Sequence, residues 1–149
     1  MKLTAEQVIE LAKLAHENNQ SPDFKQQDLP SLGFFRADLH GANFTEANLS
    51  STNFGKANLS RAKFYKASLN GVDLAEADVS GADLRQADLF QANFRGANLQ
   101  GADLRNANLD ETNFIDADLR DADLRGARFT SYTKWSVAFD PVKAGAVRR

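Results

Sequence analysis

Large apolar side chains recur every five residues along most of this chain. The spacing runs unbroken from Phe24 to Phe129, and every one of these central residues is Leu or Phe except Val79. Ala usually stands two residues before the central residue, and Asn or Asp usually stands directly before it. A helix repeats every 3.6 residues and a flat strand every two, so neither element explains the pattern. The period predicts a chain that turns a corner every five residues and stacks each turn on the next.

The exceptions to the alanine rule indicate how many sides each turn has. Leu32, Thr52, Val72 and Thr112 stand where alanine is expected, and their separations are all multiples of twenty. A three-sided coil would scatter these residues over different sides. We therefore predict square turns of four five-residue sides, with the coil spanning residues 22–131. The phenylalanines group at the same spacing, in one column of Phe24, Phe44 and Phe64 and another of Phe34, Phe54, Phe94 and Phe114.

The tandem motif A-[DN]-[LF]-x-x resembles the repeat of the pentapeptide repeat family, as in ANFRGANLQGADLRNANL at residues 92–109. The resemblance covers about three quarters of the chain without a slip in register. It implies an all-β solenoid, a right-handed quadrilateral β-helix whose central and alanine positions line the interior. The handedness is implied by the resemblance alone. The stretch FDPVKAGA at 139–146 is similar to the closing segment of many cyanobacterial members.

Residues 1–21 are expected to form a helical cap on the first turn of the coil. Thr4 and Gln7 have the spacing of a capping box, which predicts a helix from about residue 5 to 18. Open solenoid ends expose backbone groups and apolar side chains, so a cap is needed there. The apolar face predicted to cover the turn consists of Val8, Leu11, Ala12 and Ala15, widened by Ile9 and Leu14.

Residues 132–149 depart from the repeat and are expected to close the other end. Lys134 occupies the next central position, and aromatic residues follow outside the register. We interpret this segment as a plug across the last turn. The alternative is a dimer contact through Trp135 and Phe139, so the chain is expected to be a monomer or a dimer joined at its C-terminal end.

Composition excludes several classes of protein. The net charge of −2 does not suggest a nucleic-acid binder, and the lack of cysteine excludes disulfides and thiolate metal sites. Glu6, Glu10 and Glu17 interrupt the apolar residues at the N-terminus, which favours neither a signal peptide nor a membrane span. The expectation is a cytoplasmic protein that binds neither membranes nor nucleic acid directly.

No residue pattern of this chain indicates an enzyme. There is no nucleophile motif or phosphate-binding loop, so we expect no catalytic residues and no cofactor. His16 and His40 each lack a second histidine at metal-ligand spacing, so no metal site is expected. A rod filled with Leu and Phe also leaves no internal cavity for a substrate.

The sequence favours an interaction or scaffold module with a protein partner of unknown identity. The candidate partner-binding strip is the least charged outward column of the coil. The alternative is a DNA mimic that modulates a type II topoisomerase such as gyrase, an activity implied by the family resemblance. That activity requires dense carboxylates, but even the most acidic side, which holds Leu49 and Leu89, sums only to −3. The strip consists of Phe35, Gly55, Ala75, Arg95 and Ile115.

Three Asp residues recur at a spacing of twenty residues, and each is followed by Arg two residues later. These columns could form a recognition stripe, but alternating charges that offset one another on a solvated face explain them better. The pairs are Asp83 with Arg85, Asp103 with Arg105, and Asp123 with Arg125.

Overall fold

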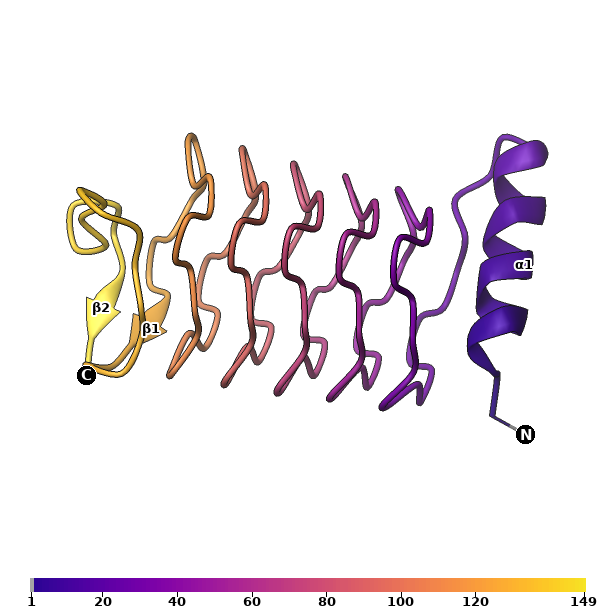
Figure 1. The fold of residues 1–149 in the computed structure, drawn as a ribbon, viewed down its shortest axis with the longest axis horizontal. Coiled ribbons are helices and arrows are strands. Elements are labelled where there is room, and N and C mark those ends of the chain that lie inside the picture. The colour runs from indigo at the N-terminus through magenta and orange to yellow at the C-terminus, as the bar shows by residue number, and fades with distance from the viewer. Residues whose placement is uncertain (1) are drawn as a thin grey trace.

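The protein is a straight stack of turns with a helix across one end (Figure 1). The computed structural model describes residues 2–149, so residue 1 of the expected cap lies outside the described residues. Helix α1 spans Ala5–Glu17, and strands β1 (Arg128–Phe129) and β2 (Val147–Arg148) pair in parallel at the opposite end. Within residues 2–149, no helix has the length and apolar character needed to cross a membrane.

Parallel bridges between residues twenty apart hold the turns together. They run from Asp23 with Asn43 to Asn108 with Arg128, and Asn53 pairs with Asp73. Thr52 and Val72 therefore lie on the same side, and the prediction of four sides per turn is confirmed. The all-β description needs correction, however. The sides form single bridges, and the described residues contain only the two short strands β1 and β2. The backbone bends away after each bridge, which prevents longer pairing.

Asn and Asp before each central residue hold the corners. Asn53 Oδ1 accepts a hydrogen bond from the backbone N–H of Gly55 at 2.8 Å, and the same contact recurs around the coil. The second residue after the centre has a left-handed backbone, with φ of 65° at Gly71 and 55° at Lys66. The side-chain amides also link turns, since Asn43 Nδ2 donates to Asp23 Oδ1 at 3.1 Å. The Asn and Asp residues therefore bend each turn and join it to its neighbour.

The interior is a continuous column of Leu, Phe and Ala side chains. Phe24, Phe44 and Phe64 stack with ring centroids 5.4 Å apart, and these rings are almost fully buried. Thr52 and Thr112 replace buried alanines, and their hydroxyls are satisfied. Thr52 Oγ1 donates to the carbonyl of Leu29 at 3.0 Å, and Thr112 Oγ1, three turns further along the same column, donates to the carbonyl of Leu89 at 2.8 Å. The core therefore accepts Thr where a backbone carbonyl lies within reach.

Helix α1 covers the first turn with a narrower face than the sequence predicts. The capping box of Thr4 and Gln7 is present, and Val8 and Ala12 are fully buried against the coil. Leu11 is 46% exposed, and Ile9 and Leu14 are exposed to a similar extent, so the wide apolar face was a wrong prediction. A helix lying on the flat end of a solenoid contacts it along a single line. Only a stripe of residues spaced by about four can reach that line.

The repeat continues past residue 131 after a one-residue insertion. Lys134 pairs with Asn113, which is twenty-one residues earlier, so Trp135 takes the central position that the sequence assigns to Lys134. The Trp135 ring stacks on Phe114 with centroids 4.9 Å apart, and Phe139 stacks on Trp135 at 5.3 Å. Trp135 is therefore within the register and extends the phenylalanine column. Phe139 follows it by four residues rather than five and closes the column by stacking on Trp135, as expected of a plug.

Candidate interaction surface

The five residues of the predicted strip lie in one column on the surface of the coil. Backbone hydrogen bonds join successive turns beside the strip. The N–H of Lys56 donates to the carbonyl of Ala75 at 2.9 Å, and the N–H of Gly96 donates to the carbonyl of Ile115 at 3.0 Å. With layers about 4.8 Å apart, the column is roughly 19 Å long. The structure thus brings together Phe35, Gly55, Ala75, Arg95 and Ile115.

Phe35 is the most prominent apolar group of the strip. Its side chain is 55% exposed, and its ring lies against Gly55, where an added Cβ would stand 3.1 Å from Cδ2 of the ring. Gly55 is buried, whereas Ala75 and Ile115 are half-buried. Arg95 is the one charged member. The strip is therefore a shallow apolar line with one cation in it.

Charged side chains of the next outward column border the strip. The Arg36 guanidinium carbon lies 5.3 Å from the centroid of the Phe35 ring. Lys56 Nζ lies 3.4 Å from an oxygen of Glu76, and Arg95 Nε lies 3.9 Å from Asp116. These exposed pairs contribute little to stability, but they leave this side without net charge. A partner would meet an apolar centre with a balanced polar rim.

Replacing Gly55 with alanine should displace the Phe35 ring. The new methyl group would press against the ring, and neither backbone torsion of Gly55 requires glycine. We expect a change in the free energy of unfolding within about 1 kcal/mol, because the ring can move into solvent. NMR shifts of the Phe35 ring protons would report the displacement. Gly33→Ala is the matched control, since nothing lies within 4 Å of its added Cβ; equal ring shifts in both variants would contradict the packing.

The Asp–Arg columns neutralise themselves, in agreement with the sequence analysis. Arg85 binds Asp83 through two bonds, Nε to Oδ1 at 2.8 Å and Nη2 to Oδ2 at 2.7 Å. Its Nε also lies 3.7 Å from Asp103 in the next turn. Arg105 repeats both contacts one turn further, with Asp103 and with Asp123. Asp83, Asp103 and Asp123 therefore each face a guanidinium.

Acid should weaken the coil by protonating Asp residues that are paired with Arg, both in these columns and at Asp118, which pairs with Arg120 on another side of the coil. Hydrogen bonds from Arg120 hold the pKa of Asp118 below its ordinary value of 3.8, and Arg125 lowers the pKa of Asp123 in the same way. A carboxylate with a lowered folded-state pKa stabilises the fold above its unfolded pKa, and this contribution is lost as pH falls through the folded-state value. We expect the melting temperature to drop below about pH 4. The double variant Asp118→Asn and Asp123→Asn should show a smaller drop; an identical pH profile would contradict the assignment.

Two of the four carboxylates on the most acidic side are also paired with basic residues. Lys2 Nζ lies 2.5 Å from Asp28 Oδ2, and Arg149 Nη2 lies 2.9 Å from Asp110 Oδ2. The bond from Lys2 is the largest cause of a lowered pKa at Asp28. A surface that imitates the phosphates of DNA needs unpaired and closely spaced anions. This side does not present them at Asp28 or Asp110.

One cluster escapes sequence analysis. His16 and His40 lie twenty-four residues apart in the chain, yet their rings stack with centroids 3.9 Å apart. Asp38 lies beside them, with Oδ1 at 2.8 Å from His40 Nδ1. The prediction that neither histidine has a partner for metal binding was based on sequence spacing alone. Sequence spacing did not show that the two histidines are neighbours in space, because the turn after α1 folds the helix back onto the coil.

A match to a sequence model of the repeat assigns the chain to a family. A sequence model described as pentapeptide repeats matches the chain in eight copies, at residues 34–71, 52–91, 67–106 and 92–130. These matches span more than half of the chain. The chain belongs to the pentapeptide repeat family. A comparison with curated protein sequences gave no match.

Solved pentapeptide repeat proteins share the fold. Rfr23 from the cyanobacterium Cyanothece 51142 is 28% identical with a TM-score of 0.66, over 77% of this chain and 88% of that one. Trypsin-treated QnrB1, described as a plasmid-mediated fluoroquinolone resistance protein, is 21% identical with a TM-score of 0.56, over 87% of this chain and 83% of that one. The protein alr5209 from Nostoc PCC 7120 is 29% identical with a TM-score of 0.36, over 98% and 96%. The likenesses to Rfr23 and QnrB1 imply a right-handed quadrilateral β-helix for this pentapeptide repeat protein.

Proposed function

We propose that this pentapeptide repeat protein is a non-enzymatic interaction module that presents one side of its coil to another protein. The observation that carries the proposal is the exposed Phe35 ring at one end of the strip, on the side of the coil without net charge. Aromatic side chains flanked by polar groups are common anchors of protein interfaces. The core side chains fill the axis, and their rings stack from turn to turn, so the outer sides are what the fold offers to a partner.

The strip can be tested with a pair of matched aromatic variants. Phe35→Ser should weaken capture of a specific partner by roughly 10-fold or more, since truncation of an aromatic anchor costs on the order of 2 kcal/mol. Phe90→Ser is the control, because Phe90 is an exposed phenylalanine at the same repeat position on another side. Quantitative mass spectrometry of proteins captured from the source organism would compare the three baits. A captured set that Phe35→Ser leaves unchanged would contradict the proposal.

Modulation of a type II topoisomerase by DNA mimicry is the second candidate function. The QnrB1 likeness supports the shared fold only. The ion pairs at Asp28 and Asp110 count against the second candidate, because they neutralise part of the acidic side. A gyrase supercoiling assay separates the two functions. Inhibition by the purified chain at low micromolar concentration would favour the topoisomerase function, and no inhibition would favour the interaction module.

A further inference from the structure

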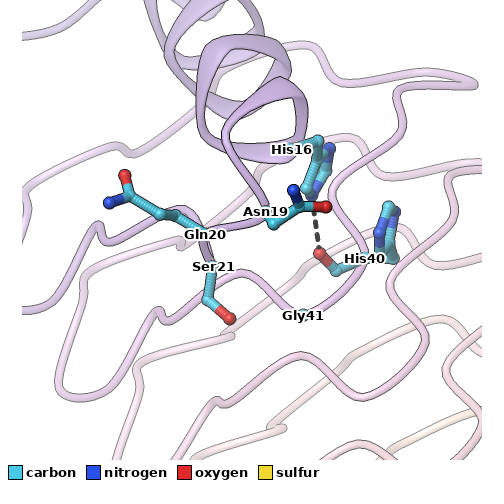
Figure 2. A pocket seen from close by; sticks show the side chains of 6 residues that line it. All are labelled: His16, Asn19, Gln20, Ser21, His40 and Gly41. Atoms are coloured by element: carbon cyan, nitrogen blue, oxygen red, sulfur yellow. Dashed lines mark hydrogen bonds between the residues drawn. The ribbon is translucent and has the colours of Figure 1, made fainter.

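His16, Asp38 and His40 bring three potential metal ligands together where α1 meets the coil. Figure 2 shows His16 at the end of the helix and His40 on the coil. Both side chains line a hollow of about 280 Å³. One donor atom from each of the three side chains lies within 4.8 Å of the other two. The His16 and His40 rings are nearly parallel, at an angle of 10°. Two elements far apart in sequence therefore supply a complete set of two imidazoles and one carboxylate.

The hydrogen bond of His16 leaves one of its ring nitrogens free. His16 Nε2 lies 2.9 Å from the carbonyl oxygen of His40, and a carbonyl can only accept, so Nε2 carries the hydrogen. A neutral His16 ring then has its lone pair on Nδ1. Metal-binding histidines commonly have this arrangement, in which the second ring nitrogen donates to a backbone carbonyl and orients the ring. The contact thus leaves the His16 Nδ1 lone pair available to an ion, although the ring must first turn out of its stacked position.

The spacing between Asp38 and His40 also suits an ion. Asp38 Oδ1 and His40 Nδ1 are 2.8 Å apart. Adjacent ligands around an ion with bonds of about 2.1 Å stand roughly 3.0–3.4 Å apart, so an ion can take the place of the shared proton. His16 must turn and approach by roughly 1 Å to complete the site. This movement separates the stacked rings and keeps α1 on the coil.

The charge that favours a cation comes from the ligand Asp38 itself. Glu17 and Lys13 line a second hollow with His16 and offset one another. Arg61, Lys63 and Asp78 line a third hollow with His40. Imidazole together with carboxylate suits zinc and other divalent transition ions, whereas magnesium and calcium prefer all-oxygen sites.

We propose that His16, Asp38 and His40 bind a divalent transition-metal ion such as Zn²⁺, which fastens the helical cap to the coil. The ion joins α1 directly to the first turns of the solenoid. A ligand that binds only the folded state stabilises it. The metal therefore strengthens the cap that shields the end of the apolar core.

The test uses the full chain without a histidine tag, whose own imidazoles would bind the same ions. Isothermal titration with ZnCl₂ should show one saturable site, and the melting temperature should rise by a few degrees with zinc and return with EDTA. MgCl₂ should do neither. His16→Gln and His40→Gln should each weaken zinc binding at least 10-fold. Co²⁺ should give a visible d–d spectrum with the parent chain and lose it in both variants.

Asp78→Asn is the matched control for Asp38→Asn. Asp78 lies in the same column two turns away and makes the same bond to the backbone two residues on, but Ser80 stands where His40 stands beside Asp38. Asp38→Asn should weaken zinc binding, and Asp78→Asn should leave it unchanged. Circular dichroism checks that each variant is folded. The proposal is overturned if the parent chain shows no saturable zinc binding, or if the folded histidine variants bind zinc as tightly as the parent.

Discussion

Leu84→Asp should unfold the coil. Leu84 is fully buried on the axis in the middle of the chain, within the continuous cluster of apolar side chains, so a carboxylate there would be surrounded by apolar groups. Burying an unpaired charge costs more than loss of the leucine contacts alone, so we expect the free energy of unfolding to fall by about 4 kcal/mol or more. Each turn contacts only its neighbours, so disrupting a turn in the middle of the coil removes the contact between the turns before it and the turns after it. Urea denaturation followed by circular dichroism would measure the loss.

Two controls sharpen this result. Leu84→Met keeps the apolar volume and should cost less than about 1.5 kcal/mol. Arg85→Ala removes the neighbouring outward side chain and its pairs with Asp83, which should change stability by less than about 1 kcal/mol. Equal tolerance of Leu84→Asp and Arg85→Ala would show that the central residues do not face the interior.

Val8→Asp should detach the helical cap. Val8 is fully buried between α1 and the first turn, so a carboxylate there loses its hydration without gaining a partner. We expect the free energy of unfolding to fall by about 3 kcal/mol. The variant should also associate as its concentration rises, because the uncapped end exposes apolar side chains and backbone groups. Size-exclusion chromatography with light scattering would detect the association, and thermal melting would measure the loss.

Leu11→Asp is the matched control on the same helix. Leu11 is 46% exposed on the flank of the contact, so its replacement should change stability by about 0.5 kcal/mol or less. The pair tests the narrow contact face directly. A similar loss in both variants would restore the wide face that the sequence predicts and contradict the observed packing.

The architecture could be predicted because the repeat records it at every position. Thr52 and Val72 break the alanine rule twenty residues apart, and this spacing alone specifies which residues stack. The positions of Phe35 and Ile115 in one column follow from the same count. Local rules also predicted the start of α1, since the capping box involves only Thr4 and Gln7. These features could be predicted because each depends only on neighbouring residues or on the twenty-residue spacing of the repeat.

What the sequence could not predict depends on how the ends dock. The buried stripe of α1 depends on the angle at which the helix meets the coil, which no periodicity encodes. The position of Trp135 depends on one inserted residue, and a shift of one changes the central residue from Lys134 to Trp135. The contact of His16 with His40 depends on the path of the chain between α1 and the first turn. These features come from tertiary packing and become visible only in the structure.

The most direct test of stacked squares is a disulfide between residues twenty apart. The chain contains no cysteine, so Ala75→Cys with Arg95→Cys introduces a single pair on adjacent turns of the strip. Their Cα atoms should stand about 4.8 Å apart, within the range that a disulfide spans. Mild oxidation should close this bond rapidly within one molecule, whereas Ala75→Cys with Phe90→Cys, fifteen residues apart on different sides, should stay reduced. Equal oxidation of both pairs, or of neither, would contradict the square coil.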